Sequence, residues 1–116
     1  MNITVYGIPH CDTVKKARAW LADHGIAYAF HDYKKQGVPL ARLDDWMRQL
    51  GWEALLNRKG TTWRKLDAER QAAVQDAASA HELMVAQPSV IRRPVLEYPG
   101  GVRVGFDADE WGRVLV

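Results

Sequence analysis

The sequence has 116 residues, 47% of them hydrophobic, which fits one domain that buries about two-thirds of its unfolded surface. Its 16 basic and 14 acidic residues nearly balance, which argues against a nucleic-acid-binding protein that relies on bulk charge. A single cysteine cannot form an internal disulfide, the first residues lack a signal-peptide pattern, and no stretch is apolar enough to span a membrane. We therefore expect a protein of the reducing cytoplasm.

The first third of the chain predicts a strand, a loop, a helix and a second strand. An apolar strand over residues 3–6 is followed by a bend through Gly7 and Pro9. Residues 11–24 then show the spacing of one buried helix face, whose apolar members are Val14, Ala17 and Leu21. A second strand over residues 26–33 follows, and this order predicts a right-handed parallel crossover.

Cys11 falls at the start of the predicted helix. The first main-chain N–H groups of a helix have no partner inside it and carry partial positive charge. This position therefore favours the thiolate form of the cysteine. Because Asp12 is adjacent and opposes ionisation, a strongly ionised thiol needs a further positive group from elsewhere in the chain.

The middle of the chain is predicted to be helical. The spacing of apolar residues indicates a helix over residues 39–50, and an alanine-rich stretch indicates two more, over about 67–78 and 80–86. We place the break between these two at Ser79, because Ser79 and Glu82 match a capping box with the serine as N-cap.

The last part of the chain returns to strands. Residues 93–98 and 102–104 flank the turn Pro99-Gly100-Gly101 and predict a β-hairpin. Asp107 is placed to cap a closing helix. The order is therefore βαβ, a helical segment over about residues 40–87, and ββα.

This order, with a cysteine at the first helix and a proline that opens the third strand, resembles the thioredoxin fold. More narrowly, residues 6–17 (YGIPHCDTVKKA) and 91–95 (IRRPV) resemble the arsenate reductase (ArsC)/Spx family, and the first stretch is most similar to its YffB branch. The resemblance implies an α/β fold in one domain, 1–116, with a four-stranded mixed sheet, flanking helices and a helical insertion at about 40–87.

The resemblance also implies a site. Cys11 falls on the family's nucleophile, which in its arsenate reductases attacks the oxyanion and is released by glutathione and glutaredoxin. Arg93 falls on an arginine before the family's cis-proline, here Pro94, and would supply the positive group that Cys11 needs.

Further candidates are Thr13 as a donor near the thiol, His10 as a group that tunes Cys11 or acts as a base, and Lys15 and Arg58 as contacts of the glutathione carboxylates. The alternative for each is an ordinary surface or helix-start role. The four histidines are dispersed and there is one cysteine, so the sequence lacks the spacing of zinc ligands. We expect no tightly bound cofactor.

Two departures from the family bear on the substrate. Asn57 and Phe106 fall where the family's arsenate reductases have two further arginines, and a desolvated oxyanion needs several fixed donors. The stretch Cys11-Asp12-Thr13-Val14 also lacks the second cysteine of the Spx redox switch.

Together with this resemblance, these residues predict a glutathione-dependent monothiol reductase, in which Cys11 attacks a disulfide or a reducible oxyanion and external glutathione resolves the adduct. One alternative is a glutaredoxin-coupled arsenate reductase. Another is an Spx-like adaptor that binds RNA polymerase without a redox switch. A third is a protein that has kept the fold of the family and has little activity. We expect no direct contact with nucleic acid.

Overall fold

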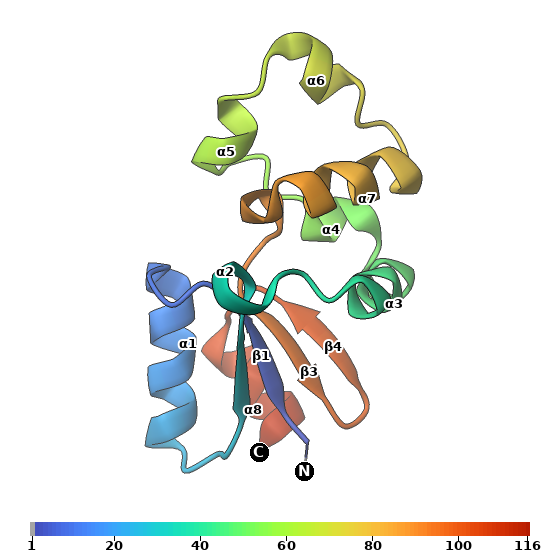
Figure 1. The fold of residues 1–116 in the computed structure, drawn as a ribbon. Coiled ribbons are helices and arrows are strands. Elements are labelled where there is room, and N and C mark those ends of the chain that lie inside the picture. The colour runs from blue at the N-terminus through green and yellow to red at the C-terminus, as the bar shows by residue number, and fades with distance from the viewer. Residues whose placement is uncertain (1) are drawn as a thin grey trace. The chain divides into compact units, whose positions relative to one another are not determined.

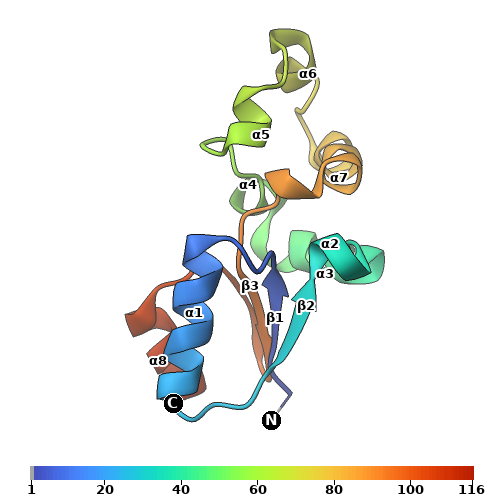
Figure 2. The ribbon, with the colours of Figure 1, turned by 60° about the vertical axis from the view of Figure 1, so that its left-hand side comes forward.

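The computed structural model of the protein describes residues 2–116 (Figures 1 and 2). Two compact units make up the fold. The first unit joins residues 2–36 to residues 93–116, and the second comprises residues 37–92.

The first unit contains a four-stranded mixed sheet with strand order β2-β1-β3-β4. Strand β1 pairs with β2 in parallel and with β3 antiparallel, and β3 pairs antiparallel with β4. Its elements are β1 (Thr4–Gly7), α1 (Asp12–Asp23), β2 (Ala29–Asp32), α2 (Tyr33–Gln36), β3 (Val95–Tyr98), β4 (Gly101–Val104) and α8 (Ala108–Leu115). The predicted α/β class and the mixed four-stranded sheet are thus confirmed.

The core of this unit lies between the sheet and two helices, and Figure 2 shows α1 and α8 on the same face of the sheet. Successive side chains of a strand point to opposite faces, so Val5 and Leu96 enter this core while their neighbours point away. Val14, Ala17 and Leu21 are buried, as their helical spacing predicts. Core residues of the sheet and the two helices are Ile3, Val5, Ala17, Leu21, Leu96, Trp111 and Leu115.

Strand register brings three segments to one edge of the sheet. Gly7 pairs with Asp32, and Tyr6 pairs with Val95. The loop after β1, the helix after β2 and the residues before β3 therefore all lie at this edge, and Figure 1 shows α2 and the start of α1 at the same end of the sheet.

Close packing between β1 and α1 fixes where the helix begins. A Cβ atom added to Gly7 would lie 2.8 Å from Cγ2 of Val14, a distance that real Cβ contacts do not reach. A glycine at this position therefore lets the first turn of α1 approach the end of the strand.

The second unit is helical, with a buried set of large side chains that includes Leu43, Trp46, Leu55 and Met84. Its elements are α3 (Leu40–Leu50), α4 (Trp52–Leu55), α5 (Thr61–Arg64), α6 (Ala68–Ala72), α7 (Ala77–Ala86) and the short 3-10 helix η1 (Pro88–Val90). No helix in residues 2–116 is long and apolar enough to cross a membrane.

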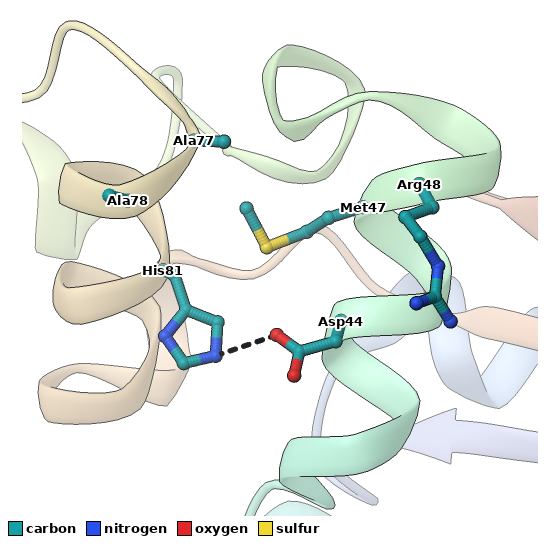
Figure 3. A pocket seen from close by; sticks show the side chains of 6 residues that line it. All are labelled: Asp44, Met47, Arg48, Ala77, Ala78 and His81. Carbon is teal, nitrogen blue, oxygen red and sulfur yellow. Dashed lines mark ion pairs between the residues drawn. The ribbon is translucent and has the colours of Figure 1, made fainter.

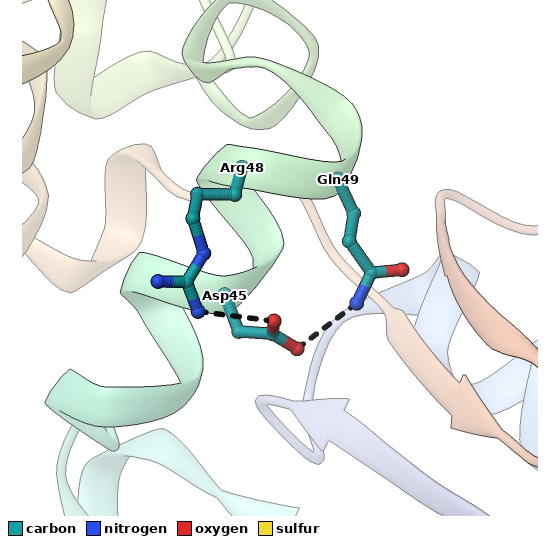
Figure 4. Close-up of polar contacts among 3 residues, drawn as sticks. All are labelled: Asp45, Arg48 and Gln49. Atoms are coloured by element: carbon teal, nitrogen blue, oxygen red, sulfur yellow. Dashed lines mark hydrogen bonds and ion pairs between the residues drawn. The ribbon is translucent and has the colours of Figure 1, made fainter.

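Asp45 forms two polar side-chain contacts on the surface of helix α3. Asp45 accepts a hydrogen bond from Gln49 at 3.0 Å and forms an ion pair with Arg48 at 3.3 Å (Figure 4). Pairs at this helical spacing contribute about 0.2–0.5 kcal/mol each, so they support α3 without determining the fold.

The predicted break at Ser79 is wrong. Helix α7 begins earlier, with Asp76 as its N-cap, and α6 is correspondingly short. The Asp76 carboxylate accepts the Ser79 N–H at 2.8 Å, while the Ser79 hydroxyl accepts the Asp76 N–H at 3.1 Å. The capping box that forms has Asp76 as N-cap and Ser79 at N3, in place of the predicted Ser79 and Glu82, because aspartate is as good an N-cap as serine and stands three residues ahead of it.

Gly7→Ala tests the contact between β1 and α1. We expect it to reduce the free energy of unfolding by about 1–3 kcal/mol, because the new methyl group overpacks against Val14. Urea unfolding followed by tryptophan fluorescence measures this change.

Gly112→Ala is the matched control, since its Cβ would meet only Trp20 at an ordinary 3.9 Å inside helix α8. It should leave stability unchanged or raise it by up to about 1 kcal/mol. If Val14→Ala fails to lessen the cost of Gly7→Ala in the double variant, the steric explanation is incorrect.

Candidate active site around Cys11

Cys11 is the N-cap residue of helix α1, with φ −74° and ψ 126°. Its N–H donates to the carbonyl of Ile8 at 3.1 Å, and its own carbonyl accepts the N–H of Lys15 at 2.9 Å. The first bond closes the loop after β1, and the second is the first bond of the helix. Cys11 is partly exposed, so an attacking or attacked molecule can reach it.

Opposing influences act on ionisation of the thiol. Burial raises the pKa of Cys11, but interactions with the Val14 N–H, the Arg93 guanidinium and the Thr13 N–H lower it, and the positive charge of Arg93 lowers it further. The net effect is a pKa below that of an ordinary cysteine. Because the sulfur makes no capping hydrogen bond of standard geometry, we attribute the contribution of the N–H groups to the electrostatic field of the helix start.

Arg93 reaches this position from the other end of the chain. It directly precedes Pro94, and the peptide bond between them is cis. Pro94 is buried, and its carbonyl accepts the N–H of Gly105 at 2.8 Å, which anchors the start of β3. The Arg93 guanidinium lowers the pKa of the Cys11 thiol, so these two predicted residues are brought together.

The other predicted residues are less closely tied to the sulfur. Thr13 contributes its main-chain N–H, and its side chain is exposed. His10 and Lys15 are exposed on the same loop and helix. Arg58 belongs to the second unit, where its guanidinium lies 5.7 and 5.8 Å from the ring centroids of Trp52 and Trp63.

Asn57 and Phe106 both make contacts with residues close to them in the sequence. The Asn57 side chain accepts the N–H of Lys59 at 3.1 Å and so closes a turn. The Phe106 ring packs edge-on against Trp111, with ring centroids 4.9 Å apart. The nearby Arg103 forms an ion pair with Glu110 at 2.9 Å.

Sequence reasoning missed a group of polar aromatic residues at the same edge of the sheet. Tyr33 opens helix α2 and is only 3% exposed, and its hydroxyl has no hydrogen-bond partner among residues 2–116. Burial raises the pKa of Tyr33 far above its ordinary value, Tyr6 and Glu97 add to the rise, and the charge of Arg93 opposes it. The phenol therefore stays protonated. Its place directly after the second strand does not distinguish Tyr33 from other tyrosines at the sequence level.

Tyr6 and Glu97 belong to the same group. Both point away from α1 and α8, because Val5 and Leu96 point toward them. The Tyr6 hydroxyl donates a short hydrogen bond to Glu97, and the rings of Tyr6 and His31 have centroids 5.1 Å apart. The His31 ring in turn meets Tyr33 edge-on at 6.2 Å.

A separate pocket of about 510 Å³ lies in the second unit. Figure 3 shows the Met47 side chain between helices α3 and α7, beside an ion pair between His81 and Asp44 at 3.1 Å. Asp44, Met47, Arg48, Ala77, Ala78 and His81 line it. The six lining residues carry no thiol or hydroxyl group, and no three metal-ligating side chains cluster anywhere in residues 2–116.

Arg93→Gln tests how the thiolate is stabilised. We expect it to slow alkylation of Cys11 by iodoacetamide at pH 7 by roughly fivefold, because it removes a charged donor from a partly exposed sulfur. The pH profile of the alkylation rate should shift to higher pH, since a larger fraction of the Cys11 thiol is protonated at each pH.

Arg92→Gln provides the control, because Arg92 is the exposed neighbour of the same charge. Its alkylation profile should match that of the unaltered protein. Equal slowing by both substitutions would indicate a general effect of net charge and would contradict a specific bond from Arg93.

Comparison with known proteins agrees with this geometry. A family model described as the ArsC family matches residues 6–114. The chain is similar to the solved structure of a YffB protein, with 51% identity, a TM-score of 0.93 and coverage of 98% of this chain and 99% of that one. It is also similar to an arsenate reductase (ArsC) related protein from Brucella melitensis, with 54% identity, a TM-score of 0.77 and coverage of 98% and 94%.

A curated relative, the global transcriptional regulator Spx of Listeria innocua, is 27% identical over 97% of this chain and 86% of its own length. The family therefore includes both reductase-related proteins and transcriptional regulators. From the match over most of its length and the high identity to these structures, we conclude that the chain belongs to the ArsC family.

Proposed function

We propose that the protein is a glutathione-dependent monothiol reductase with Cys11 as its nucleophile. The observation that carries this proposal is a partly exposed thiol whose pKa is lowered by a helix start and by Arg93. A thiolate is the reactive form of cysteine in exchange with disulfides, so both features serve the same chemistry.

In the first step, the Cys11 thiolate attacks one sulfur of a disulfide. A new S–S bond forms to Cys11, the original S–S bond breaks, and the departing sulfur leaves as a thiolate that takes a proton from water. Because the chain has no second cysteine, the resolving thiol is external. Glutathione thiolate then attacks the mixed disulfide, returns Cys11 to the thiolate and becomes oxidised.

Arg93 has a catalytic role in this scheme, because its guanidinium keeps the attacking sulfur ionised. We assign the Thr13 N–H, which helps to lower the Cys11 pKa, and the main chain around Pro94 to receiving the bound thiol. Lys15 is an exposed cation that we assign to a carboxylate of glutathione, and the exposed His10 is a group that would tune Cys11 or act as a base.

Arsenate is a poorer fit as the substrate. Its multiple negative charges require several fixed donors around the cysteine, whereas Asn57 closes a turn and Phe106 packs in the core. Arg103 is already paired with Glu110. Coupling to glutaredoxin would accompany arsenate reduction and is the secondary proposal.

An adaptor function is the candidate from a different class, favoured by the similarity to Spx regulators. In this proposal the protein would bind RNA polymerase independently of its redox state, because a lone cysteine cannot form the internal disulfide of a Cys-x-x-Cys switch. A stoichiometric polymerase partner that is retained in Cys11→Ser would support the adaptor over the reductase.

Incubation with oxidised glutathione tests the primary proposal. We expect intact-mass spectrometry to show one glutathione per chain, attached to Cys11 and removed again by reduced glutathione. In the control Cys11→Ser no adduct should form, and in Arg93→Gln adduct formation at pH 7 should be slower by roughly fivefold, as for alkylation.

Two results would contradict the proposal. One is an absence of adduct in protein whose Cys11 reacts normally with iodoacetamide, which would exclude glutathione disulfide as a reactant. The other is an adduct that reduced glutathione does not remove, which would exclude turnover.

A further inference from the structure

The Tyr33 hydroxyl is an exception to a general rule of protein interiors. Buried polar groups almost always have a hydrogen-bond partner, and an unpartnered one costs about 1–3 kcal/mol. Tyr33 is nearly completely buried, yet its hydroxyl has no partner among residues 2–116. Such a group suggests that the partner belongs to another state of the molecule.

The backbone around Tyr33 is firmly held, so its position is not accidental. The Asp32 carboxylate accepts the N–H of Lys34 at 2.8 Å, and the Gln36 side chain accepts the N–H of Asp32 at 3.1 Å. These two bonds clamp the turn on both sides of Tyr33. The His31 ring packs edge-on against the phenol ring and fixes its orientation further.

Sheet register relates Tyr33 to the thiol site. Asp32 pairs with Gly7, so Tyr33 begins where β2 ends, beside the loop that leads to Cys11. Val95 pairs with Tyr6, which brings Arg93 to the same edge from β3. The charge of Arg93 influences ionisation of both Cys11 and Tyr33, so its guanidinium lies within electrostatic range of both side chains.

Formation of a mixed disulfide changes what Arg93 can bind. A thiolate is a strong, charged acceptor for a guanidinium, whereas a disulfide sulfur is neutral and a weak one. The attraction between the Arg93 guanidinium and the Cys11 sulfur therefore weakens when the adduct forms. The hydroxyl oxygen of Tyr33, at the same end of the sheet, is an acceptor that has no partner among residues 2–116.

We propose that Tyr33 is a positioning residue of the thiol site, whose hydroxyl oxygen accepts a guanidinium N–H from Arg93 once Cys11 carries a mixed disulfide. The inference rests on the proposed function, because it concerns the adduct that Cys11 forms. In this state Tyr33 keeps Arg93 beside the sulfur, ready to stabilise the thiolate that the resolving thiol regenerates.

Tyr33→Phe tests this role, because it removes one oxygen and preserves the ring. The equilibrium between reduced protein and adduct is measured by acid quenching and intact-mass spectrometry in mixtures of reduced and oxidised glutathione. We expect Tyr33→Phe to lower the equilibrium constant for adduct formation by about threefold to tenfold. The pKa of Cys11 in the reduced protein should remain that of the unaltered chain.

Two controls separate positioning from simple packing. Tyr6→Phe removes a hydroxyl that already donates to Glu97, so it should destabilise reduced and adducted protein alike and leave the equilibrium unchanged. Reduced Tyr33→Phe should unfold at a urea concentration no lower than the unaltered protein, because the lost hydroxyl has no partner in the described part of the chain. In an Arg93→Gln background the effect of Tyr33→Phe on the equilibrium should disappear.

An unchanged equilibrium constant in Tyr33→Phe overturns the proposal. So does a change in the equilibrium constant that is equally large whether residue 93 is arginine or glutamine. Measurements with 2-hydroxyethyl disulfide distinguish this failure from that of the proposed function. If Cys11 forms the hydroxyethyl adduct but not the glutathione adduct, glutathione dependence fails while the smaller adduct still reports on Tyr33. If neither adduct forms, both proposals are overturned.

Discussion

The structure of the candidate site depends on one interaction, in which a partly buried sulfur lies between the start of a helix and a guanidinium. Burial by itself would keep Cys11 protonated, so the N–H groups of Val14 and Thr13 and the charge of Arg93 must outweigh desolvation. Because ionisation is favoured in the folded state, the thiolate contributes stability above the pKa of an unfolded cysteine. That contribution is lost as pH falls through the lower pKa of the folded protein.

The fold explains how residues at opposite ends of the sequence come to share this interaction. Parallel pairing of β1 with β2 and antiparallel pairing of β1 with β3 bring the Cys11 loop, Tyr33 and Arg93 to one edge. Gly7 then allows the first turn of α1 to approach β1 closely. A cysteine at a helix start and an arginine before a strand are each ordinary features. The strand pairing of the sheet brings Cys11 and Arg93 together as one site.

Much of this could be predicted from the sequence. The apolar spacing of Val14, Ala17 and Leu21 is a local signal, and it located both the helix and the cysteine at its start. The pairing of Cys11 with Arg93 spans most of the chain and came from the resemblance to a family, not from local patterns. The role of Asp76 was missed because two residues three positions apart can each serve as N-cap, and the competition between them depends on the helix that follows.

Tyr33 could not be identified in advance for a different reason. A tyrosine after a strand is common. What distinguishes this one is a buried hydroxyl without a hydrogen-bond partner among residues 2–116, a property that depends on every element packed around it. Asn57 and Phe106 illustrate the converse. Their departure from the family pattern is visible in the sequence, and the structure adds that both have local packing or turn roles.

The central claim is that the Cys11 sulfur is ionised more readily than an ordinary thiol. The most direct measurement is a pH titration of the Cys11 ¹³Cβ chemical shift by NMR, in protein labelled at cysteine. A midpoint clearly below the ordinary value of about 8.5 is the predicted result. A midpoint at or above that value would contradict the account, because burial would then prevail over the helix start and Arg93.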